Sequence, residues 1–158
     1  MNYSEQVVNF WREFCAQNPG VNPGEPFQVW FFSNTRESAK ELVELVLAGK
    51  KTATASLIEV NEISPENAPV DGGYSVVTDF DGNPRCVVQT IEIRHLPFEA
   101  VDAAFAFDEG EGDQSLEYWR ACHWKYFSEE AAQVKIEFNE KSLIVCERFK
   151  LLFPAAKK

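Results

Sequence analysis

The stretch YSVVTDFDGNPRCVVQTIEI, residues 74–93, decides the fold that we expect for this chain. Its two ends, 74–80 and 86–93, are rich in β-branched and aromatic residues, which favour strands. The residues between them, Asp81-Gly82-Asn83-Pro84, are typical of a tight turn, so the two strands should form a hairpin. Because hairpin strands are antiparallel, we expect an α+β fold around an antiparallel sheet or barrel, and not a doubly wound parallel sheet.

Helices and shorter strands should surround this hairpin. The apolar residues Val7, Phe10, Trp11 and Phe14 recur at helical spacing and predict a helix over 3–17, which the loop 18–24 ends. A second helix should follow Asn34 as its N-cap and stop at Gly49. We further expect strands over 27–32, 52–57 and 143–153, and helices over 98–107 and 115–132.

Length and composition indicate one globular domain, 1–158, in which an N-terminal helix and loop (1–24) precede the core (25–154). A net charge of −10 argues against a surface for extended duplex DNA, so any nucleic-acid partner should be small or single-stranded. The four cysteines lie far apart without a C-x-x-C pair, which predicts no structural zinc site. No leader and no apolar run of the ~20 residues that span a bilayer are visible, so we expect a cytoplasmic protein without a membrane partner.

Three further segments carry a family resemblance when taken together. They are LAGKKTATAS (47–56), EGEGDQSLEYWRACHW (109–124) and VCERF (145–149). Their order and spacing resemble the ASCH domain family, roughly over 29–153. The resemblance implies a PUA-like antiparallel β-barrel with flanking helices, a cleft beside the G-K-K-T-x-T turn, and a function linked to RNA or nucleotides.

The resemblance also implies particular site residues. The family includes proteins described as ribonucleases, and smaller relatives are amidohydrolases that deacetylate N(4)-acetylcytidine. The site of these amidohydrolases contains a Lys and a Thr, to which Lys51 and Thr54 correspond by position, and a Glu from a later acidic segment. Glu111 is our choice for that Glu, and Glu109 is the alternative alignment.

The chemistry of these residues allows more than one role. A desolvated Lys51 could act as a base that activates the Thr54 hydroxyl, with Glu111 moving a proton. A protonated Lys51 could instead hold a phosphate. A structural explanation is equally simple, because Lys50 and Lys51 follow a helix end, where cations complement the helix dipole. Lys50 and Ser56 are additional substrate-binding candidates.

The predicted helix over 115–132 supplies a second group of candidates. A base could stack on Trp119, with Arg120 near a phosphate and His123 as an acid, although such aromatics more often belong to a core and a lone helical His is usually hydrogen-bonded within the fold. Ser128 and Arg148 are weaker candidates for contacts with the substrate.

The acidic loop over 108–113 fits either a solvated loop or a site for Mg²⁺ or Mn²⁺. We assign no metal ligand and no definite cofactor. The resulting hypothesis is a protein that binds RNA or a small nucleotide or nucleoside, acting as a ribonuclease or nucleotide-processing hydrolase through a cleft centred on Lys51. The alternatives are an amidohydrolase of a modified nucleoside such as N(4)-acetylcytidine and a non-catalytic RNA-binding module.

Overall fold

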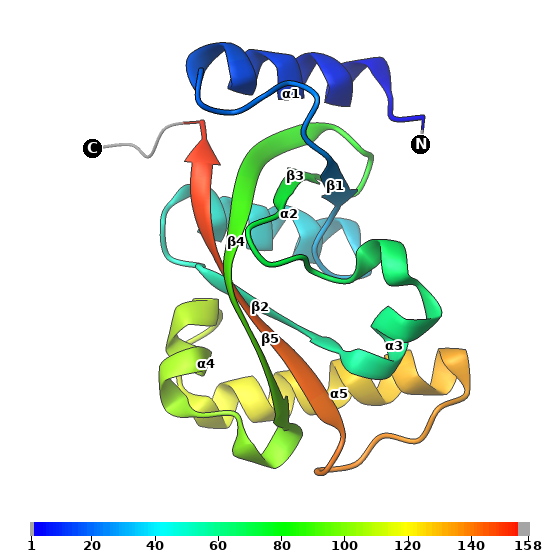
Figure 1. The fold of residues 1–158 in the computed structure, drawn as a ribbon. Coiled ribbons are helices and arrows are strands. Elements are labelled where there is room, and N and C mark those ends of the chain that lie inside the picture. Colours follow the sequence, from blue (N-terminus) through cyan, green and yellow to red (C-terminus); the bar gives the residue numbers. More distant parts are fainter. Residues whose placement is uncertain (1, 155–158) are drawn as a thin grey trace.

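The structure is a computed structural model that describes residues 2–154. Helices lie around a single sheet, in which two strands are long and bent (Figure 1). The helices are α1 (Glu5–Gln17), α2 (Arg36–Leu47), α3 (Ile58–Ile63), α4 (Ala103–Glu109) and α5 (Leu116–Val134), with 3-10 turns η1 (Pro65–Asn67) and η2 (Phe98–Ala100). The strands are β1 (Phe27–Trp30), β2 (Ala53–Leu57), β3 (Tyr74–Thr78), β4 (Pro84–Pro97) and β5 (Leu143–Phe153). Within 2–154, no helix is long and apolar enough to cross a membrane.

The sheet confirms the predicted hairpin and the α+β class. Its strand order is β1-β3-β4-β5-β2, in which β3, β4, β5 and β2 pair antiparallel and β1 joins β3 in parallel. The two edge strands, β1 and β2, do not pair with each other within residues 2–154, so the sheet is not closed. In place of the expected closed barrel, the structure has a bent open sheet with β1 and β2 as its edges (Figure 1).

The bend of the sheet lies in its two longest strands. Register shifts interrupt the pairing of β4 with β5 between Val87 and Val88 and between Thr90 and Glu92. Such irregularities increase twist and bend a strand pair. The two strands can therefore run from α1 at one end of the molecule to α5 at the other (Figure 1).

Alternating side chains of the β3–β4 hairpin are buried on the two opposite faces of the sheet. Val76 and Val87 pack against Trp11 and Phe14 of α1. The neighbouring positions Val77 and Val88 pack with Val43 and Val46 of α2 on the opposite face. Strand side chains point alternately to the two faces, so one apolar run contributes to both clusters. A third cluster packs α4 and α5 against β2 and the other end of β5.

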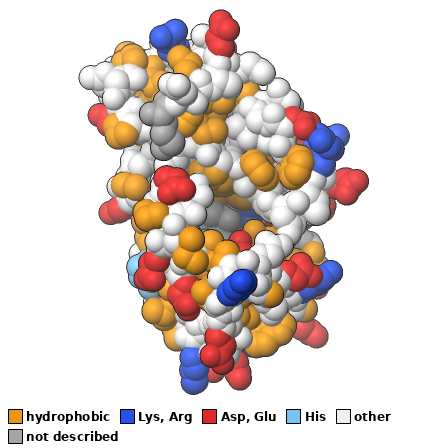
Figure 2. All heavy atoms as spheres, turned by 90° about the vertical axis from the view of Figure 1, so that its right-hand side faces the viewer, with side chains coloured by type: hydrophobic (Ala, Val, Ile, Leu, Met, Phe, Trp, Pro, Cys, Tyr) orange, Lys and Arg blue, Asp and Glu red, His pale blue; other side chains and the backbone are white. Residues whose placement is uncertain are grey.

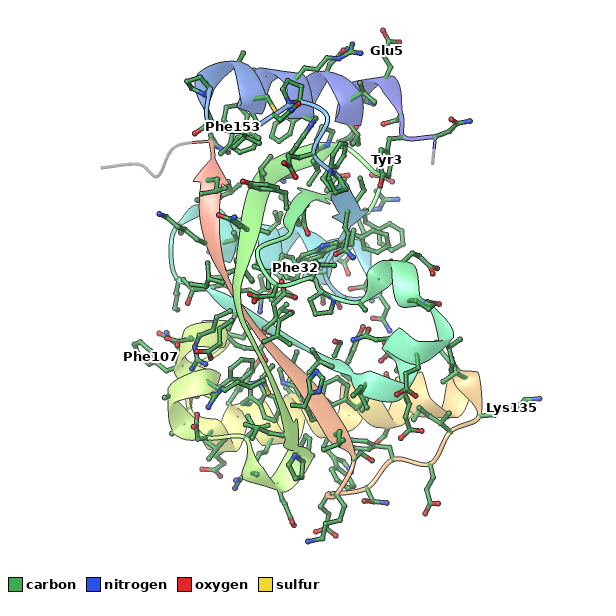
Figure 3. All side chains as sticks on the ribbon, in the orientation of Figure 1. Tyr3, Glu5, Phe32, Phe107, Lys135 and Phe153 are labelled. Atoms are coloured by element: carbon green, nitrogen blue, oxygen red, sulfur yellow. The ribbon has the colours of Figure 1, made fainter. Side chains whose placement is uncertain are left out.

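Some boundaries differ from the prediction for local reasons. Thr35, not Asn34, caps α2, since the Thr35 hydroxyl accepts a hydrogen bond from the Ser38 N–H. The helix expected over 98–107 is divided into η2 and α4, because Asp102 begins a new helix by accepting from the Phe105 N–H. Phe32 lies in the interior, whereas Phe107 projects outward from α4 (Figure 3).

Candidate functional site

A cavity of about 730 Å³ opens between the α2 side of the sheet and α5. Its lining comes from β1, α2, β2, α3, the loop after α4, α5 and β5. Figure 2 shows that the face carrying β1 and α3 is hollowed between an upper and a lower half. Cavities of this size hold small-molecule ligands, so this is the candidate site.

Lys51 lies in the wall of this cavity. The turn after α2 is fixed by two backbone bonds, in which the N–H groups of Lys50 and Lys51 donate to the Leu45 carbonyl, and Thr52 then donates its N–H to the Asp108 carbonyl. These bonds direct the Lys51 side chain inward, where it is only 1% exposed. Its ammonium lies 2.9 Å from Glu109 Oε1, 2.9 Å from Glu111 Oε2 and 3.3 Å from the Glu109 carbonyl oxygen.

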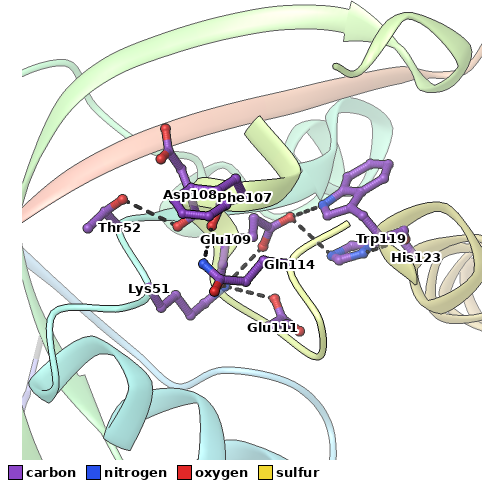
Figure 4. Close-up of polar contacts among 9 residues, drawn as sticks. All are labelled: Lys51, Thr52, Phe107, Asp108, Glu109, Glu111, Gln114, Trp119 and His123. Atoms are coloured by element: carbon purple, nitrogen blue, oxygen red, sulfur yellow. Dashed lines mark hydrogen bonds and ion pairs between the residues drawn. The ribbon is translucent and has the colours of Figure 1, made fainter. Parts of the chain in front are cut away.

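Both acidic partners depend on the backbone between them. Gly110 caps α4 in the left-handed conformation, with φ +72°. A Cβ atom at this position would lie 2.4 Å from the Lys50 carbonyl oxygen. Glycine therefore allows the chain to reverse against the Lys50–Lys51 backbone, and this reversal brings Glu109 and Glu111 to the same ammonium (Figure 4).

Two residues of α5 bind the other oxygen of Glu109. The indole N–H of Trp119 donates to Glu109 Oε2, and His123 Nε2 lies 3.2 Å from the same oxygen. His123 Nδ1 lies 2.9 Å from the Trp119 carbonyl oxygen, which can only accept. Both ring nitrogens of His123 thus face acceptors, and this arrangement favours the imidazolium.

Burial disfavours charge throughout this cluster, and the neighbouring charges decide the result. Burial pulls the pKa of Lys51 down, but the carboxylates of Glu109 and Glu111 outweigh it and raise the pKa above its usual value. Burial pushes the pKa of Glu109 up, but Lys51 and His123 hold it well below the ordinary carboxyl range. Burial raises the pKa of Glu111. Burial lowers the pKa of His123, but the Glu109 carboxylate outweighs this effect, so the pKa of His123 is raised as well.

These surroundings bear on the expected role of Lys51. A lysine that acts as a base needs a neutral amine, whereas two carboxylate partners favour the ammonium. Glu111 is the carboxyl of the cluster whose charge is least supported, because its burial raises its pKa and Glu109 carries the same charge beside it. The side chain suited to exchange protons is therefore Glu111, and Lys51 supplies positive charge.

The same cluster resembles a cation site in composition. Glu109, Glu111 and His123 offer ligand atoms that lie within 4.8 Å of one another. Carboxylate oxygens and imidazole suit divalent ions such as Mn²⁺. The Lys51 ammonium, however, lies within hydrogen-bonding distance of both carboxylates, and a divalent ion beside it would meet strong repulsion. The arrangement favours an internal ammonium over a metal.

The structure brings part of the predicted site together. Of the residues proposed from the sequence, the cavity lining contains Lys51, Thr54, Ser56, Glu111 and His123. Trp119 is buried and reaches the cluster through its bond to Glu109.

The other proposed residues do not line this cavity. Lys50 and Arg120 are exposed, and Arg120 donates to the Glu99 carbonyl oxygen. Arg148 lies on the opposite face of β5, where it pairs with Asp108 and Glu92. Ser128 is half-buried on α5.

Two acidic residues of the site were not chosen from the sequence. Glu109 was retained only as an alternative to Glu111, yet the structure brings both to Lys51. Glu147 is buried in the cavity wall opposite Thr54 on the paired strand β2. In a strand over 143–153, successive side chains point to opposite faces, so Glu147 and Arg148 must face opposite ways, but the sequence does not say which face carries the cavity.

Comparison with known proteins agrees with the resemblance seen in the sequence. The sequence model of the ASCH domain matches residues 28–152. The crystal structure of an ASCH domain from Lactobacillus crispatus JV V101 is similar, with a TM-score of 0.86 and 30% identity over 96% of this chain and 97% of that one. A protein from Enterococcus faecalis V583, of family DUF984, gives a TM-score of 0.82 and 30% identity over 93% of this chain and 88% of that one.

More distant comparisons add less. The crystal structure of a hypothetical protein shares 16% identity, with a TM-score of 0.53 over 79% of this chain and 97% of that one, and shows a common fold alone. No curated protein matches the chain.

Proposed function

Because the chain belongs to the ASCH domain family, which is generally linked to RNA binding, we propose that its cavity binds a nucleobase and that the cluster around Lys51 hydrolyses an amide on that base. The base would be part of a nucleoside or of single-stranded RNA, and N(4)-acetylcytidine is the first substrate to consider. The observation that carries this proposal is the contact of Lys51 with Glu111 in the cavity wall.

The lining of the cavity supports the nucleobase. The lining contains both aromatic and neutral polar side chains, among them Trp30, Phe31, Phe32, Tyr118, Tyr126, Ser56, Asn61 and Asn67. Aromatic rings stack on bases, while amides and hydroxyls bond to base edges. The Asn61 amide donates to the Ser56 hydroxyl at 2.9 Å, which orders one such polar group.

The charges of the lining favour an amide over a phosphodiester. Within the described part of the chain, the basic side chains of the lining are Lys51 and His123, and both are paired with carboxylates. A phosphate would bring further negative charge towards Glu109, Glu111 and Glu147. An uncharged acylated base avoids this repulsion, so the amidohydrolase is preferred to the ribonuclease.

A mechanism of hydrolysis follows from these contacts. Glu111, as carboxylate, removes a proton from water while the water oxygen bonds to the amide carbon. The Lys51 ammonium gives up its long hydrogen bond of 3.3 Å to the Glu109 carbonyl oxygen and donates to the oxyanion that forms, which it stabilises. The C–N bond then breaks, and Glu111 returns the proton to the departing amine. Thr54, in the same lining, can donate its hydroxyl to the bound carbonyl.

Incubation of the purified protein with N(4)-acetylcytidine tests the proposal. We expect release of acetate and cytidine, and a loss of about 10²-fold or more in kcat for Glu111→Gln, which keeps the size of the side chain but cannot exchange the proton. Single-stranded RNA with and without Mn²⁺ is the parallel substrate. Hydrolysis of RNA without deacetylation would show that the protein is a ribonuclease and not an amidohydrolase. If neither substrate is turned over, the remaining hypothesis is a non-catalytic RNA-binding module.

A matched control separates chemistry from folding. Glu99→Gln removes an exposed carboxylate that pairs with Lys141 outside the cavity. We expect this variant to keep full activity. Circular dichroism of both variants establishes that each is folded before its rate is compared.

A further inference from the structure

Helix α5 forms a long wall of the cavity, and this wall reaches past the cluster around Lys51. The lining includes α5 residues at intervals of four, namely Tyr118, Cys122, Tyr126 and Glu130. Residues four apart on a helix are neighbours on the same face. At about 1.5 Å per residue, Glu130 lies roughly 10 Å along the helix axis from His123, which belongs to the cluster. The cavity therefore has a second end, away from Lys51.

Helix α3 supplies another wall of this second end. β2 passes through Ser56 and leads directly into α3, whose Asn61 also lines the cavity. The Asn61 amide donates to the Ser56 hydroxyl at 2.9 Å, which fixes the orientation of both side chains. α3 faces the C-terminal half of α5 (Figure 1), and its Val60 packs against the core cluster that contains Phe127 of that half. Asn61 and Glu130 therefore belong to the same end of the cavity.

The polar groups at this end suit neutral hydroxyl groups. Glu130 is half-buried, and no Lys, Arg or His of residues 2–154 forms an ion pair with it. An asparagine side chain has two N–H groups and a carbonyl oxygen, so Asn61 can bond to a ligand while it donates to Ser56. A phosphate beside Glu130 would meet a carboxylate without a basic partner, whereas a hydroxyl can donate to that carboxylate.

We propose that Glu130 is a specificity-determining residue, which forms hydrogen bonds with the ribose hydroxyls of a nucleoside whose base lies towards Lys51. The inference rests on the proposed function, in that the cavity receives a nucleobase. A base covers only part of the wall between His123 and Glu130, and its sugar extends the ligand along the rest. Carboxylates bind ribose in the same way in dinucleotide sites, where an Asp or Glu bonds to the 2′-OH. A hydroxyl both donates and accepts, so the contact forms with an ionised or a protonated carboxyl.

Cytidine and 2′-deoxycytidine provide a direct test, because they share the base and differ by one hydroxyl of the sugar. Binding of each nucleoside is measured by titration calorimetry, with no catalytic readout. We expect the wild-type protein to bind cytidine about tenfold more tightly than 2′-deoxycytidine, since the loss of one hydrogen bond to a carboxylate supports a difference of that size.

Substitutions on α5 show whether Glu130 carries the preference. Glu130→Ala removes the carboxyl and should bind the two nucleosides equally; alanine favours a helix, so we expect this variant to fold. Glu130→Gln should keep part of the preference, because its amide can still donate and accept. Glu129→Ala is the matched control, since the neighbouring Glu129 is exposed and does not line the cavity. We expect the control to keep the full preference.

The outcomes separate this inference from the proposed function. Equal binding of the two nucleosides by the wild-type protein overturns the inference, as does a Glu130→Ala variant that keeps the full preference; neither result affects deacetylation. A preference that depends on Glu130, in a protein that does not deacetylate, would instead support the inference and overturn the hydrolytic role. Binding of neither nucleoside would overturn both the inference and the nucleobase as the ligand of the cavity.

Discussion

Lys51 and Glu109, 58 residues apart in the sequence, form an ion pair in which each side chain is only 1% exposed. Glu109 also accepts from Trp119 and contacts His123, so both of its oxygens are occupied. A buried charge of this kind depends on its partner, because water cannot replace the lost contact. The pair joins the turn after α2 to the end of α4, and it therefore holds one side of the cavity in place.

Replacement of Glu109 by glutamine should destabilise the protein by about 3 kcal/mol, because it leaves the Lys51 and His123 charges with less compensation in a buried site. The measurement is the free energy of unfolding from urea denaturation. Glu99→Gln provides the matched control, since its pair with Lys141 is exposed and its loss should change stability by less than about 1 kcal/mol. Equal effects of the two substitutions would show that burial of the Lys51 pair has no energetic importance.

Stability should fall as the pH rises through the neutral range. Burial lowers the pKa of His123, but Glu109 reverses this effect, so the folded-state value exceeds that of the unfolded chain. The stabilising contribution is complete below the unfolded value of about 6.5 and is lost as the pH rises through the folded-state value. His123→Asn should flatten this decline in the free energy of unfolding between pH 6 and pH 9. His95→Asn, outside this cluster, should leave the decline as it is in the wild type.

The fold was predictable where its signals were local. The hairpin over residues 74–93 follows from a turn sequence between two apolar runs, and these signals need no distant partner. Closure of the sheet depends on whether β1 and β2 meet, although 22 residues lie between them in the chain. Nothing in either segment encodes that meeting, so the resemblance suggested a barrel and the structure has an open sheet.

The site was predictable in its residue types but not in its connections. Lys51 and Thr54 follow from the G-K-K-T-x-T segment. The choice between Glu109 and Glu111 was posed as an alternative, whereas the left-handed Gly110 turns both towards Lys51. The protonation of Lys51 follows from that double contact. The sequence does not reveal that Glu109 and Glu111 both contact Lys51. It therefore cannot determine whether this lysine acts as a base or as a fixed positive charge.

Divalent metals should leave the wild-type protein unchanged, because the Lys51 ammonium occupies the space between the carboxylates. Neither EDTA nor Mn²⁺ should shift its melting temperature. Lys51→Ala removes the ammonium and leaves Glu109, Glu111 and His123 able to bind a cation, so Mn²⁺ should raise the melting temperature of this variant by several degrees at concentrations well above its dissociation constant. Stabilisation of the wild type by Mn²⁺ would contradict the assignment of Lys51 as the internal cation.

Thr54→Ala should reduce deacetylation while leaving the fold intact. Thr54 lines the cavity, and loss of its hydroxyl removes one donor near the reacting carbonyl, which is expected to lower kcat about tenfold or more. Stability should change by less than about 0.5 kcal/mol, because the side chain is half-buried and small. Thr52→Ala is the neighbouring control, since the exposed Thr52 hydroxyl bonds to the Asp108 carbonyl outside the cavity. Equal losses of activity in the two variants would show that the Thr54 hydroxyl has no specific role in the reaction.

Gly110→Ala tests whether the backbone reversal positions both carboxylates. The left-handed conformation alone costs an alanine about 1–2 kcal/mol, and here a Cβ would also lie 2.4 Å from the Lys50 carbonyl oxygen. Gly49→Ala is the matched control: φ is +79° there, but no atom lies within 4 Å of the added Cβ. We expect the Gly110 variant to lose more stability than the control and to lose activity as well, because the reversal must open and separate Glu111 from Lys51. If both variants lose the same stability and keep full activity, the close approach of Gly110 to Lys50 is not what holds the site together.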